Sequence, residues 1–202
     1  MAWYDITGTV SDLIMAIAAV YAAMNVKDLI KERTHTIGLK KAEGIVLSLD
    51  KFKDSIYKTI YPLTEFDLLL NGDDFSNHDL LLNNRKNLFK LRREIEYLKK
   101  QHQEIKYSID TIERWNVTIK NNNIIIPMLN NMIEFLNSSD NAALNGISFL
   151  DEDKSNLVTR RTFSKSFKTN YNDALASHAN IEPIYSEFSM IKFSSLFSIQ
   201  NM

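Results

Sequence analysis

A heptad-like run of apolar residues in the middle of the chain constrains the fold most strongly. Every d position of the run is aliphatic, and charged residues flank it. Such a seam is typical of a coiled coil or of a long helix in a bundle. We therefore predict an all-α fold, an elongated helical bundle or hairpin with one long coiled-coil-like helix. The seam consists of the a positions Leu88, Ile95, His102, Ile109 and Asn116, and the d positions Leu91, Leu98, Ile105, Ile112 and Ile119.

Two a positions of this seam, His102 and Asn116, are polar. A single polar residue at an a position can fix the register and the number of paired helices, at a cost in stability. Alternatively, the bundle is open at these levels and both side chains are hydrated. If His102 is buried without an anionic partner, its pKa should lie below the usual value of about 6.5.

Composition excludes several classes of protein. The 202 residues include 5 Gly and 3 Pro, too few for the turns of a β-sandwich or a doubly wound sheet. The absence of Cys excludes disulfides, thiolate metal sites and a cysteine nucleophile, and it suits the cytoplasm. Lys and Arg number 24 against 25 Asp and Glu, so a nucleic-acid partner would need a local basic patch.

We expect one all-α domain over 1–202, in which an apolar N-terminal helix occupies 1–38 and a long helical hairpin occupies 39–122. The N-terminal helix should end before Gly38, and the next helix should kink or break at Pro62.

The second arm of the hairpin has a clear start signal. Ser76 can cap it, Asp79 completes a capping-box-like arrangement, and Phe75 can pack onto Leu80. Shorter helices in 123–202 should pack back onto the hairpin. We expect them at 124–136, with Pro127 in the first turn, and at 183–199, beginning at Pro183, with loops over 137–156.

The apolar run over 13–26 raises the question of a membrane. It holds about 14 residues, fewer than the roughly 20 that span a bilayer, and extending it to Ile6 brings Asp12 into the span. We therefore expect a buried helix and a cytoplasmic protein. The alternative is a single-span inner-membrane protein anchored by 6–26, with its C-terminal side in the cytoplasm because lysines follow the run.

A second candidate surface is the segment 160–168, which combines basic and aromatic residues without an acid. Such segments bind phosphate backbones or lipid surfaces when they are exposed, whereas Phe163 and Phe167, four residues apart, can also be a packed stripe of a helix. We favour packing and keep anion binding as the alternative. The basic residues are Arg160, Arg161, Lys165 and Lys168.

Motifs that would indicate catalysis or a metal are incomplete. Glu32 and His35 form one Glu-x-x-His, whereas helical di-iron sites need two such pairs and two further glutamates. The acidic run 151–153 lacks the Gly and Glu of a calcium loop, and no glycine-rich phosphate loop occurs. We predict no catalytic residue, no metal and no cofactor.

The remaining features favour a non-enzymatic helical protein that binds protein. It would associate with itself or serve as a subunit of a larger assembly, bacterial or from a phage. Its competitors are the membrane-anchored protein with a cytoplasmic partner-binding region and a helical module that grips nucleic acid or lipid through 160–168.

Overall fold

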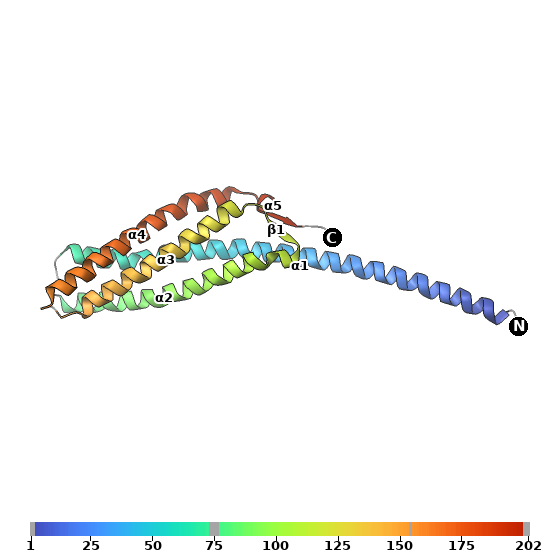
Figure 1. The fold of residues 1–202 in the computed structure, drawn as a ribbon, viewed down its shortest axis with the longest axis horizontal. Helices are drawn as coiled ribbons and strands as arrows, with labels where there is room; N and C mark the ends of the chain where they lie inside the picture. Colours follow the sequence, from blue (N-terminus) through green and yellow to red (C-terminus); the bar gives the residue numbers. More distant parts are fainter. Residues whose placement is uncertain (1–2, 73–76, 154, 200–202) are drawn as a thin grey trace.

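A computed structural model of the chain describes residues 3–72, 77–153 and 155–199, with side chains from residue 15 onward. Long helices make up most of these residues, which confirms the predicted all-α class (Figure 1). The elements are α1 (Trp3–Asn71), α2 (His78–Thr111), the 3-10 turn η1 (Ile112–Trp115), β1 (Val117–Ile119), α3 (Asn122–Asp151), α4 (Leu157–Met190), α5 (Phe193–Leu196) and β2 (Phe197–Ile199).

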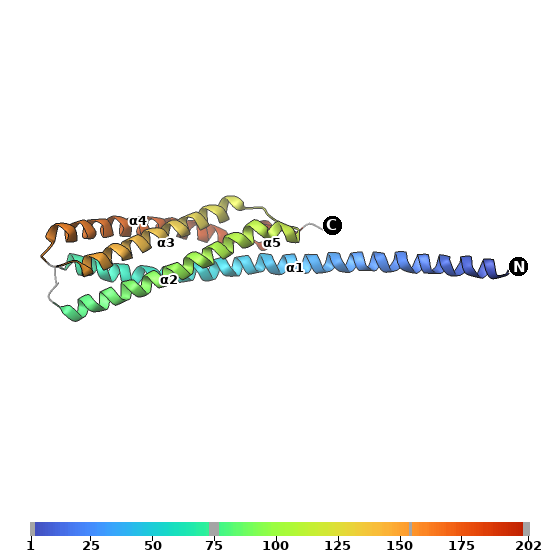
Figure 2. The ribbon, with the colours of Figure 1, turned by 60° about the horizontal axis from the view of Figure 1, so that its bottom comes forward.

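Within the described residues, α2, α3, α4 and the C-terminal half of α1 lie side by side as a four-helix bundle (Figures 1 and 2). The N-terminal half of α1 continues straight beyond the bundle (Figure 2). The strand β2 lies near the place where α1 leaves the bundle (Figure 1). The fold therefore has two parts, a bundle and a projecting helix.

Helix α1 is continuous, and the predicted end before Gly38 is wrong. Gly38 has an ordinary helical backbone, and its missing side chain serves packing instead. A Cβ atom there would lie 2.7 Å from the carbonyl oxygen of Trp115 and 2.9 Å from the side chain of Val117. This glycine therefore lets η1 and β1 approach the helix.

A break of α1 at Pro62 is also not found. Proline in a helix interior costs about 3 kcal/mol, because it removes one hydrogen bond and crowds the preceding turn. Leu63 and Phe66, just beyond it, are fully buried. Burying two such side chains stabilises the helix by a similar or larger amount, so packing keeps it continuous.

The N-cap of α2 is Asn77, whose side-chain oxygen accepts a hydrogen bond from the backbone N–H of Leu80 at 3.1 Å. The expected cap, Ser76, and its neighbour Phe75 lie outside the described residues. Asn has the short acceptor side chain that this position requires.

The helical seam ends earlier than predicted, because α2 ends at Thr111. Asn116 lies after η1 with a φ of 56°, in the left-handed region that Asn tolerates better than most residues. Ile119 lies in β1, which pairs antiparallel with β2 in the register Val117 to Ile199. The last a and d positions are thus outside the helix, and β-branched residues after the left-handed turn favour the strand.

The predicted loops over 137–156 are wrong for 137–151, since α3 continues to Asp151, and the connection to α4 lies over 152–156. Ala142, Ala143 and Gly146 are buried along one face of this stretch, and packing outweighs the weak helix propensity of its Asn, Ser and Asp residues. Pro127 lies beyond the first turn of the same helix.

The last long helix is also misplaced in the prediction. It runs over Leu157–Met190, and the side chain of Asn156 caps it by accepting from the N–H of Thr159 at 3.3 Å. Pro183 therefore lies inside α4 and does not begin it.

The core fills the space between the four helices and is rich in phenylalanine. Phe66 of α1 meets Phe167 of α4 edge to face, with ring centroids 4.8 Å apart, and meets Phe149 of α3 at 6.0 Å. Such pairs add roughly 0.5–1.5 kcal/mol each to the gain from burial. These contacts hold α1 in place against α3 and α4, and so fix the direction in which its projecting half leaves the bundle.

Candidate interaction surfaces

The seam of α2 faces the interior of its own chain. Helix α2 packs against both α1 and α3, and these helices cover its apolar side chains. A surface for a partner must therefore lie elsewhere. The seam residues that the structure buries are Leu88, Leu91, Ile95, Leu98, His102, Ile105, Ile109 and Ile112.

His102 is a buried polar residue with a partner. Its Nε2 lies 3.0 Å from the carbonyl oxygen of Leu129 in α3, and its ring lies 6.0 Å from the ring of Phe52 in α1. Burial lowers the pKa of His102, the hydrogen bond to Leu129 opposes this change, and nearby Lys106 adds to it. The neutral ring with its proton on Nε2 satisfies this geometry by donating to the carbonyl.

A charged cluster links α2 and α3 at their partly exposed edge. The carboxylate of Asp140 accepts hydrogen bonds from Arg92 Nε and Lys99 Nζ, each at 2.9 Å. Burial alone would raise the pKa of Asp140, but the bonds from Arg92 and Lys99 outweigh it and hold the pKa below its usual value. The cluster is a structural link between two helices.

The basic segment 160–168 lies in the first half of α4. Phe167 is fully buried and Phe163 packs against the core, so the aromatic half of a stacking surface points inward. The guanidinium of Arg160 covers the ring of Phe149 at 4.3 Å, and Lys168 Nζ donates to Asn71 Oδ1 at 2.6 Å.

Two further cations of this segment, Arg161 and Lys165, are exposed on α4. Of the four basic residues, Arg160 covers an aromatic ring of α3, Lys168 makes an exposed contact with α1, and Arg161 and Lys165 face solvent. Without an exposed ring between them, the pair lacks the aromatic element that single-stranded nucleic-acid sites combine with charge.

The most unusual surface is the projecting half of α1. Every residue over 15–33 is exposed, which corrects the expectation of a buried helix at 13–26. The reason is that α1 is longer than the bundle. No helix of the described residues is long and apolar enough to cross a membrane. The large apolar side chains of the projecting half of α1 are 53–69% exposed. They are Met15, Ile17, Val20, Tyr21, Met24, Val26, Leu29 and Ile30.

One side of the projecting helix is mostly apolar or small from residue 15 onward, with Arg33 in its middle and Lys40 and Lys41 beside its last turn. Residues three, four or seven positions apart fall on one line of a helix with 3.6 residues per turn. The line is turned away from the side of α1 that carries the core residues Ala42, Ile45 and Leu49. We call it the outer stripe, and it consists of Met15, Ala19, Ala22, Val26, Ile30, Arg33, Ile37 and Gly44, each of them exposed.

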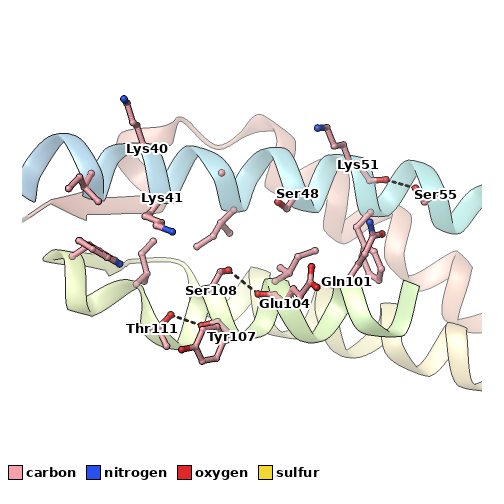
Figure 3. A pocket seen from close by; sticks show the side chains of 17 residues that line it. Lys40, Lys41, Ser48, Lys51, Ser55, Gln101, Glu104, Tyr107, Ser108 and Thr111 are labelled. Carbon is pink, nitrogen blue, oxygen red and sulfur yellow. Dashed lines mark hydrogen bonds between the residues drawn. The ribbon is translucent and has the colours of Figure 1, made fainter. Parts of the chain in front are cut away.

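The outer stripe leads onto a groove between α1 and α2. The groove has a volume of about 700 Å³, with Gly44 and Lys41 among its α1 residues and Glu104 on α2. Lys41 points across it, whereas Lys40 and Lys51 point outward (Figure 3). A Cβ atom on Gly44 would meet nothing within 4 Å. The groove thus has an open floor at Gly44, with Lys41 on its α1 side and Glu104 on its α2 side.

Within the described residues, no group of three or more histidines or carboxylates is placed to hold a metal ion. No protein-family model, curated protein or solved structure matches this chain.

Proposed function

We propose that this chain is a non-enzymatic helical interaction protein, either self-associating or a subunit of a larger assembly, and that the projecting half of α1 is its docking element. One observation carries the proposal: the eight large apolar side chains of 15–30 lie on a helix that its own bundle does not cover.

The physical argument concerns water and helix stability. Continuous apolar surface beyond a few hundred Å² is rare on a soluble monomer and marks contact sites. A helix without tertiary contacts is also only marginally stable, since most helix stability in proteins comes from packing of an apolar face. A covering partner would therefore both remove the apolar side chains from water and stabilise the projecting helix.

The neighbouring surfaces support a protein partner. After Val26 the projecting helix is amphipathic, with Leu29, Ile30 and Ile37 on one side and Lys27, Lys31 and Glu32 on the other sides. An amphipathic helix of this kind pairs with another helix through its apolar side. We place the assembly in the cytoplasm, in line with the absence of Cys.

The test measures the mass of the protein as it is isolated from cells, by size exclusion with light scattering. We expect a particle heavier than the 23.3 kDa chain. The double variant Val26→Glu, Leu29→Glu should lose the extra mass. The matched control changes Leu157 and Val158, two exposed apolar residues at the start of α4, to Glu and should behave as the unchanged chain. A monomeric natural chain, or an assembly that survives Val26→Glu, Leu29→Glu, overturns the proposal.

A further inference from the structure

We infer that the partner of the projecting helix is a second copy of this chain, docked antiparallel along the outer stripe with a two-fold axis at Val26. The inference rests on the proposed function and names its partner. It follows from the spacing of the stripe, from its pairs of a small and a long residue, and from its charges.

The outer stripe is symmetric about Val26. Counting back from Val26, the stripe residues Ala22, Ala19 and Met15 lie at 4, 7 and 11 residues, and the same steps forward reach Ile30, Arg33 and Ile37. In an antiparallel pair centred on Val26, the stripe residues from Met15 to Ile37 therefore lie opposite one another, and Val26 lies opposite its own copy. A two-fold interface requires such self-complementarity, in which residue i meets j and j meets i.

Two pairs in this symmetric arrangement combine a small residue with a long one. Ala22 lies opposite Ile30 and Ala19 lies opposite Arg33, whereas Met15 lies opposite Ile37. At 18 residues from Val26, Gly44 lies opposite helix position 8, which is also glycine. Small residues allow two helix backbones to approach closely. Gly44, whose Cβ position has open space around it in its own chain, would therefore allow the partner helix to approach closely.

Charge selects the antiparallel orientation. A parallel pair would place Arg33 against Arg33 and Lys40 against Lys40, and like charges face to face are destabilising. In the antiparallel pair, helix position 12 of one copy lies opposite position 40 of the other. The sequence has Asp at 12 and Lys at 40 and 41. The N-terminal end of each copy would thus reach Lys40 and Lys41 of its partner, beside the groove.

The size of the contact agrees with a stable dimer. The overlap from 8 to 44 is about 54 Å long at 1.5 Å per residue, and a strip about 10 Å wide gives about 500 Å² on each copy. The pair would bury about 1,000 Å² in total, which reaches the lower bound expected of a specific interface.

Cysteine scanning tests this arrangement directly, because the natural chain contains no Cys. Under mild oxidation, Val26→Cys should form a disulfide-linked dimer, since the two-fold axis brings position 26 of both copies together. Arg33→Cys should not link to itself, because the two residues would lie about 21 Å apart along the axis, beyond the roughly 7 Å that a disulfide spans between Cα atoms. A mixture of Arg33→Cys with Ala19→Cys should link the two variants to each other.

Two results would overturn the inference. Self-linkage of Arg33→Cys as strong as that of Val26→Cys would show a parallel pair. No linkage of any variant, together with a natural chain that sediments at 23.3 kDa at every concentration, would exclude a second copy. If the purified chain is monomeric but the particle isolated from cells is heavier than 23.3 kDa and loses that mass in Val26→Glu, Leu29→Glu, the proposed function stands with another protein as the partner.

Discussion

The Nε2 atom of His102 in α2 lies 3.0 Å from the carbonyl oxygen of Leu129 in α3. This contact joins two helices that are also held together by apolar side chains, by the Asp140 cluster and by the ion pair of Arg85 with Asp151. His102 is the only histidine of the seam, and its buried partner is a carbonyl oxygen, which accepts a hydrogen bond from the ring.

His102 should make the stability of the bundle depend on pH. Because burial lowers its pKa in the folded state, the unfolded chain takes up the proton first as pH falls. The free energy of unfolding should therefore be independent of this site above about 6.5 and should fall below that pH until the folded pKa is reached. Urea unfolding at pH 7.5 and 5.5 measures the loss, and His102→Leu should reduce it while raising stability at pH 7.5.

A second histidine provides the control for this experiment. His178 packs edge to face on Tyr57, with ring centroids 4.5 Å apart, and its pKa is also lowered, by burial and then by Lys53. His102→Leu should therefore leave part of the pH dependence, and the double variant with His178→Phe should remove most of the rest. An unchanged slope in His102→Leu would mean that this ring is hydrated.

Asp140→Asn should destabilise the bundle by about 1–3 kcal/mol at pH 7, because hydrogen bonds to charged groups are the stronger ones and this carboxylate is partly buried. The folded pKa of Asp140 is lowered, so the stabilisation is present above about pH 3.9 and is lost as pH falls through the folded value. The difference between Asp140→Asn and the natural chain in urea unfolding should shrink between pH 5 and pH 2. A difference that stays constant over this range would contradict the assignment.

The sequence predicted the class and the buried side of α2 well, because apolar residues at heptad spacing admit few other structures. It failed where long-range packing decides. Gly38 and Pro62 look like helix ends, yet α1 passes through both, since β1 approaches the first and Leu63 is buried beside the second. The polar stretch 137–151 is helical because Ala142 and Ala143 lie in the core.

The candidate docking element could be found only in part. The apolar run over 13–26 was visible, but a single sequence does not show whether other helices cover it. That outcome depends on the length of α1 relative to the bundle, which follows from its continuity through Gly38. The symmetric spacing about Val26 is present in the sequence. It indicates a contact surface only because the structure shows that 15–33 is exposed.

Gly146→Ala should destabilise the bundle by about 1–3 kcal/mol, as expected when a packed core is overfilled. A Cβ atom there would lie 2.8 Å from the Cδ1 atom of Leu88 and 2.9 Å from the Cε1 atom of Phe66. The matched control is Gly44→Ala, where the added methyl meets nothing within 4 Å. At protein concentrations low enough to keep the chain monomeric, the control should gain up to about 1 kcal/mol from helix propensity. Equal effects of the two substitutions in urea unfolding would contradict the packing at Gly146.

The intact chain should remain in the supernatant when cell membranes are pelleted without detergent. The reason is that a second copy would cover Met15, Val26 and Ile30 of the outer stripe, and that the apolar run over 13–26 is shorter than the roughly 20 residues that span a bilayer. Fractionation followed by immunoblotting measures the distribution. Recovery only from membranes, and only with detergent, would favour a lipid-covered 6–26 segment over a helix pair.

Ala19→Leu should weaken the association of two copies. Ala19 is exposed in the single chain, so the substitution has little to disturb there, but in the antiparallel pair it lies opposite Arg33 in a closely packed contact. Overpacking of this kind costs about 1–3 kcal/mol at each site, and every 1.4 kcal/mol raises the dimer Kd about tenfold. Ala16→Leu is the matched control, because position 16 lies off the outer stripe and the added side chain should leave the Kd nearly unchanged. Sedimentation equilibrium of both variants and the natural chain measures the three constants. Equal Kd values for Ala19→Leu and the natural chain would show that position 19 does not face a partner.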